Sequence, residues 1–154
     1  MGTRISTILS NIAAVNVTVN GVTATAMALS TLPDTLRSAS FPLRLILLDG
    51  TARGNGGDGI VKLALGGSLQ QAVWTVRDIY VLRPVAQGSG LDDAIPALVN
   101  YAAAYAGAFA TKRTIATNCV IETITAEIAV WEYPEGSGTK YHIVEHGLSI
   151  RETF

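Results

Sequence analysis

A glycine-rich segment has the residue types and spacing that bind a phosphate. Gly54-Asn55-Gly56-Gly57-Asp58-Gly59 matches the G-x-G-x-x-G pattern that wraps the pyrophosphate of a dinucleotide. That chemistry needs a helix at the end of the motif, because the helix N-terminus binds the phosphate. Residues 60–65 instead have a strand-like pattern. We therefore predict a loop that binds no nucleotide, and keep a small nucleotide-binding enzyme as the less favoured alternative.

A pair of histidines, His142 and His146, has the spacing of a helical metal site. The pair lies, however, in residues 141–150, which have a strand pattern, and residues four apart in a strand are separated by about 14 Å. We therefore expect no metal site, no cofactor and no catalytic residues.

Two single residues could also react. Asp78 lies on the same strand face as Trp74 and Tyr80, so burial would require a partner from another strand or chain. A carboxylate at the edge of the surface is the simpler interpretation, and we favour it. Cys119 is the only cysteine, which excludes an internal disulfide, and its apolar neighbours predict a small buried side chain rather than a reactive thiol.

The composition favours a protein that buries much of its surface. Hydrophobic residues make up 49% of the chain and charged residues 15%, against about 25% in typical globular proteins. The formal net charge is −1 and the basic residues are scattered, so nothing favours binding to nucleic acid or to an anionic membrane. No stretch is long enough to span a membrane. We predict one domain, residues 1–154, that forms homo-oligomers.

The elements that must position these residues begin with a helix and short strands. Apolar residues at helical spacing predict a helix over residues 3–14. Alternating valines then predict a strand, and Asn20-Gly21 predicts a turn into a second extended run over residues 22–29. Residues 43–48 form a short apolar strand in which Arg44 is the only polar residue.

The second half of the chain predicts long strands around one helix. Residues 60–65 and 71–85 are expected to form an antiparallel hairpin, followed by a helix over residues 91–110. Alternation predicts a half-buried strand near residues 124–130 and a last strand over 141–150, with a bulge at Gly147. We predict an α+β fold, a mainly antiparallel β-sheet with two packing helices.

The strand at 72–85 and the helix at 91–110 are apolar on more than one side. Tyr101, Tyr105 and Phe109 repeat at helical spacing and predict a ridge that packs on the core. The opposite sides, with apolar or small residues, are predicted to contact a neighbouring subunit. These predicted contact residues are Val73, Ile79, Val81, Ala103, Ala104 and Gly107.

From about residue 30 onward, the order of elements resembles that of the tail terminator (tail completion) proteins of long-tailed bacteriophages. The residues that carry the resemblance are Leu32-Pro33-Asp34, Phe41-Pro42-Leu43, Trp74-Thr75-Val76-Arg77-Asp78-Ile79-Tyr80-Val81, Arg83-Pro84-Val85, Leu98, Tyr101, Tyr105 and His146-Gly147-Leu148-Ser149-Ile150-Arg151-Glu152.

The resemblance implies a structural virion protein rather than an enzyme. It implies a ring, typically of six subunits, that caps the head-proximal end of the tail tube and joins it to a head-side neck or connector protein. DNA would pass through the lumen without specific binding, and assembly would take place in the host cytoplasm. The loop residues Asp49, Arg53, Asn55 and Asp58 are the candidates for contact with a partner. Another virion component, such as a head–tail connector or a tail tube subunit, fits the same composition.

Overall fold

The fold is α+β, as predicted. The computed structural model describes residues 2–29, 32–36, 41–48, 60–66, 69–85 and 91–153. The helices are α1 (Gly2–Ala13) and α3 (Leu91–Ala110), and the strands are β1 (Thr18–Val19), β2 (Val22–Thr23), β3 (Thr25–Ala28), β4 (Leu43–Leu48), β5 (Ile60–Gly66), β6 (Leu69–Pro84), β7 (Thr114–Ala116), β8 (Cys119–Glu132) and β9 (Lys140–Thr153). Within the described residues, the main sheet has the order β3-β4-β6-β9-β8-β7, and β5 pairs with β6 beside β4.

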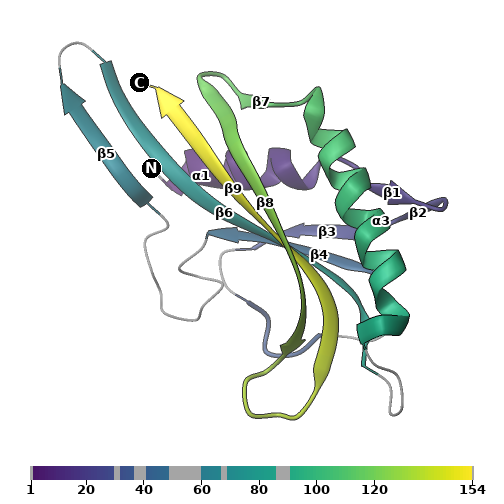
Figure 1. Ribbon diagram of the computed structural model, residues 1–154. Helices are drawn as coiled ribbons and strands as arrows, with labels where there is room; N and C mark the ends of the chain where they lie inside the picture. The colour runs from purple at the N-terminus through teal and green to yellow at the C-terminus, as the bar shows by residue number, and fades with distance from the viewer. Residues whose placement is uncertain are drawn as a thin grey trace.

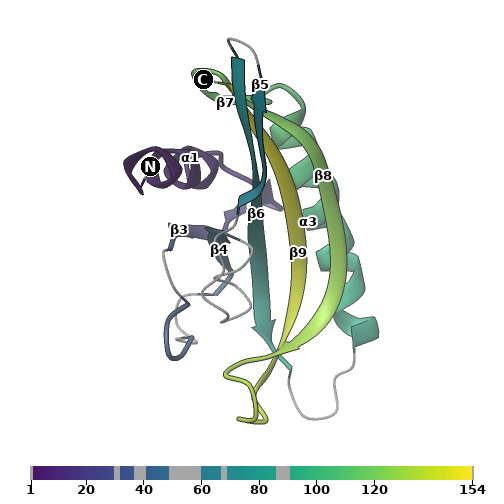
Figure 2. The same ribbon diagram turned by 90° about the vertical axis from the view of Figure 1, so that its left-hand side faces the viewer.

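Three long strands, β6, β9 and β8, form the centre of the sheet and run side by side along the molecule (Figure 1, Figure 2). All neighbouring pairs in this sheet are antiparallel except β3 and β4, which are parallel. The hairpin of β5 and the start of β6 extends beyond the other strands (Figure 1). This confirms the predicted hairpin between residues 60–65 and 71–85.

The local sequence explains the first turn. Asn20 and Gly21 have positive φ angles of 52° and 78°, as the two central residues of a type I′ hairpin turn require. Thr18 and Thr23 pair across this hairpin, and their hydroxyls are hydrogen-bonded at 2.6 Å. The turn predicted from Asn20-Gly21 is therefore confirmed.

Buried apolar residues lie on both faces of the sheet. On one face, α1 and α3 cover side chains such as Ile46, Val76 and Leu148. On the other face, a smaller cluster includes Leu45 and Ile143, with partly buried residues from outside the sheet packed on it. The prediction that both faces are covered is correct, but residues of the same chain do the covering.

The long strand β9 does not have the predicted bulge at Gly147. Gly147 lies opposite Arg77 on β6 and Thr125 on β8 without a shift in register. A Cβ atom at this position would lie 2.8 Å from the Thr125 hydroxyl oxygen, closer than such atoms normally approach. The glycine therefore leaves room for the side chain of Thr125 on the neighbouring strand, which explains why it breaks the alternation of apolar residues.

Candidate functional site

A buried ion pair lies at the centre of the molecule. Asp78 on β6 is 0% exposed and Arg44 on β4 is 1% exposed, and a guanidinium nitrogen of Arg44 lies 2.5 Å from Asp78 Oδ2. Arg44 Nε also donates to Asp78 Oδ1 at 3.3 Å. Asp78 is therefore not a surface carboxylate; it is buried, and its partner comes from another strand.

The same guanidinium also holds the end of α1. Arg44 Nη1 donates to the carbonyl of Val15 at 2.6 Å, and Nη2 donates to the carbonyl of Ile12 at 3.4 Å. These carbonyls lie at the C-terminal end of α1, where the helix dipole favours a positive charge. Burial alone would lower the pKa of Arg44, but the charge of Asp78, the hydrogen bonds to it and smaller contributions from Tyr101 and Tyr105 together outweigh burial, and the pKa is raised. Arg44 thus stays charged and joins α1 to β4 and β6.

Helix α3 contributes a third member of this cluster. The Tyr105 hydroxyl donates to Asp78 Oδ2 at 2.8 Å. Burial raises the pKa of Tyr105 well above its usual value, and the charge of Asp78 raises it further. The hydroxyl therefore remains protonated and serves as a donor. The predicted core ridge is confirmed, since Tyr101, Tyr105 and Phe109 are each no more than 1% exposed.

His146 is the fourth member, and it has no hydrogen-bond partner among the described residues. It lies directly opposite Asp78 in the pairing of β6 with β9, and its ring stacks on Tyr105 with centroids 3.7 Å apart. Neither ring nitrogen makes a hydrogen bond to the part of the chain that the structure describes, although the residue is only 1% exposed. Burial, with the charge of Arg44, lowers the pKa of His146 to about 4, so the ring is neutral near pH 7.

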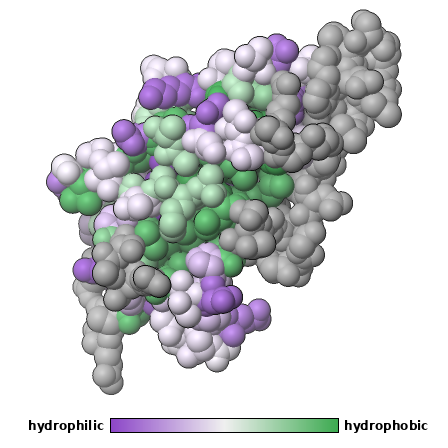
Figure 3. Space-filling view, turned by 180° about the vertical axis from the view of Figure 1, so that it is seen from behind, coloured by the Kyte–Doolittle hydropathy of each residue, from purple (hydrophilic) through white to green (hydrophobic). Residues whose placement is uncertain are grey.

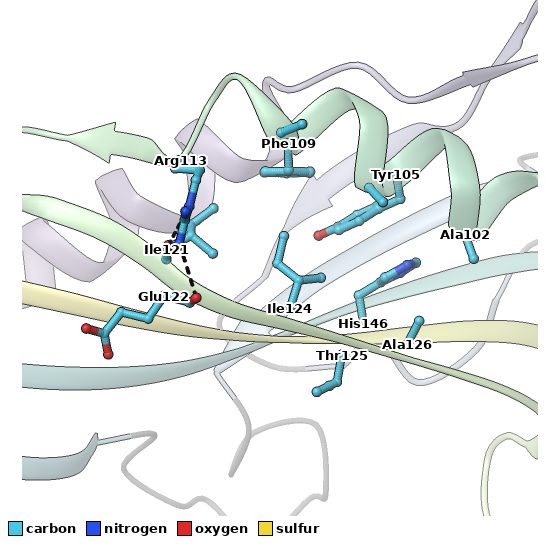
Figure 4. A pocket seen from close by; sticks show the side chains of 12 residues that line it. Ala102, Tyr105, Phe109, Arg113, Ile121, Glu122, Ile124, Thr125, Ala126 and His146 are labelled. Atoms are coloured by element: carbon cyan, nitrogen blue, oxygen red, sulfur yellow. Dashed lines mark hydrogen bonds between the residues drawn. The ribbon is translucent and has the colours of Figure 1, made fainter.

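A groove opens beside this cluster, between α3 and β8 (Figure 4). Its volume is about 330 Å³. Ala102, Tyr105, Ala106, Phe109 and Ala110 line it from α3, with Arg113 beyond the helix, Ile121, Glu122, Ile124, Thr125 and Ala126 from β8, and His146 from β9. Figure 4 shows the imidazole of His146 directed toward α3 between Tyr105 and Ala102. The walls of the groove are mostly apolar.

Strand β8 has an apolar side that the single chain leaves open. The alternation of residues 124–130 predicts a half-buried strand, yet Ile124 is 37% exposed and Val130 is 42% exposed. On its outer edge β8 pairs with β7 only at Cys119 and Val120, so within the described chain no strand pairs with the outer edge of the later residues. The prediction of a strand is confirmed, but the predicted burial of its apolar side is wrong.

Other exposed apolar side chains lie on α3. Ile95 is 36% exposed and Val99 is 47% exposed, both in the N-terminal half of the helix. Seen from behind, the described surface also has a broad apolar area bordered by polar residues (Figure 3). The molecule therefore presents apolar surface on more than one side.

The predicted contact residues fall into two groups. Ile79 and Val81 are 2% and 0% exposed, packed with Leu45 and other residues of the same chain, so they offer no surface to another subunit. The remaining predicted contacts are at least partly accessible. Val73 and Ala104 are half-buried, while Ala103 and Gly107 are exposed on α3.

The predicted partner-binding residues Asp49, Arg53, Asn55 and Asp58 lie outside the described residues. The element that follows the glycine motif is described, and it is strand β5, which begins at Ile60. No helix N-terminus follows the motif directly, so the phosphate-binding geometry that the pattern requires is not formed there.

The remaining candidates are buried. Cys119 is 0% exposed, as predicted, and His142 is also 0% exposed. His142 and His146 both lie on β9, which confirms their strand placement. Among the residues that the structure describes, no three His, Cys, Asp or Glu side chains gather in a way that could hold a metal ion.

The cluster of Arg44, Asp78, Tyr105 and His146 was not predicted from the sequence. One signal for it was present, because Arg44 is the only polar residue of an otherwise apolar strand. A lone charge in such a strand is buried only when it is paired, which should have pointed to an acidic partner on the neighbouring strand.

The comparisons with known proteins do not place this chain in a family. No protein family model matches it, and no curated protein is detectably similar to it in sequence. No helix in the described parts of the chain is both long and apolar enough to cross a membrane.

Proposed function

We propose that the chain is a structural subunit that assembles with copies of itself into a ring. The observation that carries this proposal is the open side of β8, where an alternating apolar pattern typical of a buried strand face remains exposed at Ile124 and Val130. An unpaired strand edge is a ready template for pairing with another chain. Natural monomers usually protect such an edge, so an edge with apolar neighbours favours an assembly.

A second copy of the chain is the partner that the sheet fits best. Within the described residues, β8 has an open outer edge beyond Val120, and β5 pairs only with β6, so its outer edge is open too. Pairing of one edge with a different edge on the next copy is a head-to-tail contact, and such contacts generate closed rings when the rotation closes. The small net charge of −1 means little repulsion between copies.

The biological setting of the proposed ring comes from the resemblance to phage tail terminators. In that setting the ring caps the tail tube, contacts the tube protein and a head-side neck protein, and lets DNA pass without specific binding. The ion pair of Arg44 and Asp78 supports a structural rather than an enzymatic role, because its members are paired and at most 1% exposed. A charged pair without access to solvent holds elements together and cannot reach a substrate.

The test is the mass and shape of the purified protein at micromolar concentration. We expect native mass spectrometry to give a closed oligomer and negative-stain electron microscopy to show rings with a central hole. Val130→Lys places a charge beside the open edge of β8 and should yield monomers. Val22→Lys is the matched control, because Val22 is 53% exposed in the β1–β2 hairpin.

Three results would count against the proposal. A wild-type protein that remains monomeric would reject assembly, and filaments without rings would reject closure. If Val22→Lys and Val130→Lys had equal effects, the contact would not lie at β8.

A further inference from the structure

The groove between α3 and β8 has the construction of a small-molecule site rather than of a surface crease. Three alanines spaced by one helical turn, Ala102, Ala106 and Ala110, form the α3 wall, and Ile124 and Ala126 lie on the β8 wall (Figure 4). The volume of about 330 Å³ lies within the range of ligand pockets, roughly 300–1,000 Å³. The alanines leave space that larger helix-forming residues would fill.

The polar groups of the groove differ in what they already bind. Arg113 donates from Nε and Nη2 to the carbonyl of Ile121 at 3.4 and 3.3 Å, and from Nη2 to the carbonyl of Glu122 at 3.3 Å. The Thr125 hydroxyl donates to the carbonyl of Gly147 at 3.4 Å. His146 is different, because both ring nitrogens lack a partner among the described residues.

A buried polar group without a partner is costly, so His146 points to a missing hydrogen-bonding group. The neutral imidazole has one donor and one acceptor nitrogen, and a hydroxyl can pair with either. The rings of Tyr105 and Phe109, which line the same groove, favour a flat aromatic body.

We propose that this groove binds a small aromatic molecule whose single hydroxyl forms a hydrogen bond with His146. The aromatic ring would lie between the alanine wall of α3 and the apolar residues of β8. This site is distinct from the proposed strand-edge contact, because binding within the groove does not require pairing at the edge of β8, although Ile124 belongs to both surfaces.

The probe is 2-naphthol, with 2-methylnaphthalene as a partner of similar shape that lacks the hydroxyl. Binding is followed by ¹H–¹⁵N NMR titration of the Ala106 and Thr125 amides. We expect 2-naphthol to bind about tenfold more tightly than 2-methylnaphthalene, the ratio that one net hydrogen bond gives. In His146→Leu this preference should disappear while the affinity for 2-methylnaphthalene is retained.

Two helix variants locate the site. Ala106→Leu fills the groove and should abolish binding of both probes, whereas Ala97→Leu is on the same helix, is exposed and does not line the groove. If neither probe shifts the two amides, or if Ala106→Leu binds as well as Ala97→Leu, the proposal is wrong. Equal affinity for both probes in the wild type would reject the role of His146.

The outcome is separable from that of the proposed function. Binding to a protein that native mass spectrometry shows to be monomeric would retain the site and reject the ring. Rings that bind neither probe would retain the proposed function and reject the small-molecule site. If assembly into rings in the absence of probe shifted the Ala106 amide on α3, beyond the shifts along β8 that strand pairing itself produces, a second copy would occupy the groove, and the small-molecule site would be rejected.

Discussion

Asp78 and His146 lie directly opposite each other on β6 and β9, yet the carboxylate of Asp78 is hydrogen-bonded to Arg44 and Tyr105 instead. Tyr105 connects the two, because its hydroxyl donates to Asp78 while its ring stacks on His146. The arrangement satisfies the charge of Asp78 and, within the described residues, leaves the imidazole of His146 without a hydrogen bond.

Removing one charge of the buried pair of Arg44 and Asp78 should lower the free energy of unfolding far more than removing both charges. Arg44→Met leaves Asp78 buried without its cation, and we expect a loss of about 3–5 kcal/mol in the free energy of unfolding. The double variant Arg44→Met/Asp78→Leu removes both charges and should recover much of that loss. Urea denaturation measures both. A double variant no more stable than Arg44→Met would contradict this account of the pair.

Two tyrosines one helical turn apart on α3 should respond differently to loss of the hydroxyl. Tyr105→Phe removes the donor to Asp78, a hydrogen bond to a charged group, and should cost about 1.5–3 kcal/mol. Tyr101 is also buried, but its hydroxyl has no hydrogen-bond partner among the described residues, so Tyr101→Phe should be neutral or stabilising. Thermal unfolding compares the two, and equal losses would show that the bond to Asp78 contributes little.

Acid should destabilise the fold through His146. The unfolded chain takes up this proton near pH 6.5, whereas the folded chain takes it up only near pH 4, because burial and then the charge of Arg44 lower the pKa. At a pH between these two pKa values, the unfolded chain binds a proton at His146 that the folded chain does not bind. The free energy of unfolding therefore falls as the pH drops from about 6.5 to 4. The shift corresponds to as much as about 3 kcal/mol.

His146→Leu provides the control for this pH dependence. The variant retains Asp78 and every other carboxylate, so the difference between the two unfolding curves isolates the histidine. We expect the stability of wild type relative to His146→Leu to fall with decreasing pH across this window. A constant difference from pH 7 to pH 4 would mean that the imidazole titrates normally in the folded protein.

A methyl group at position 147 should be tolerated only if the side chain of Thr125 is removed or moves aside. A Cβ at Gly147 meets the Thr125 hydroxyl oxygen at 2.8 Å, and we expect Gly147→Ala to cost about 1–3 kcal/mol. Thr125→Ala in the same chain should restore most of this loss. Gly107→Ala is the matched control, because nothing lies within 4 Å of the added atom and alanine favours a helix by about 1 kcal/mol. Chemical denaturation would show whether the two glycines differ.

Elements with a strong local signal were predictable from the sequence. The helical spacing of Ile5, Ile8 and Ile12 predicted α1, and Asn20-Gly21 predicted its turn, since each depends on residues close together in the chain. Most strands were also predictable, but β7 was not predicted, the run over residues 22–29 is divided into β2 and β3, and β8 and β9 are longer than the alternation indicated.

Which residues from distant segments meet was not predictable from the sequence. The burial of Asp78 depends on Arg44, 34 residues away, and nothing near Asp78 in the sequence indicates that partner. The alternation of β8 correctly gave the strand but not what covers its apolar side, because periodicity reports which side is apolar and not what lies against it. The groove depends on the placement of α3 over the sheet, which no local pattern contains.

The contacts of Arg44 have a consequence for the order in which the protein is made. Helix α1 is synthesised first, but the carbonyls of Ile12 and Val15 are held by Arg44, whose charge is balanced by Asp78, which in turn accepts from Tyr105. During translation, α1 is therefore complete before Arg44 is made, and well before Asp78 and Tyr105 are made. We expect the nascent helix to remain undocked, and open to chaperones, until most of the chain has emerged.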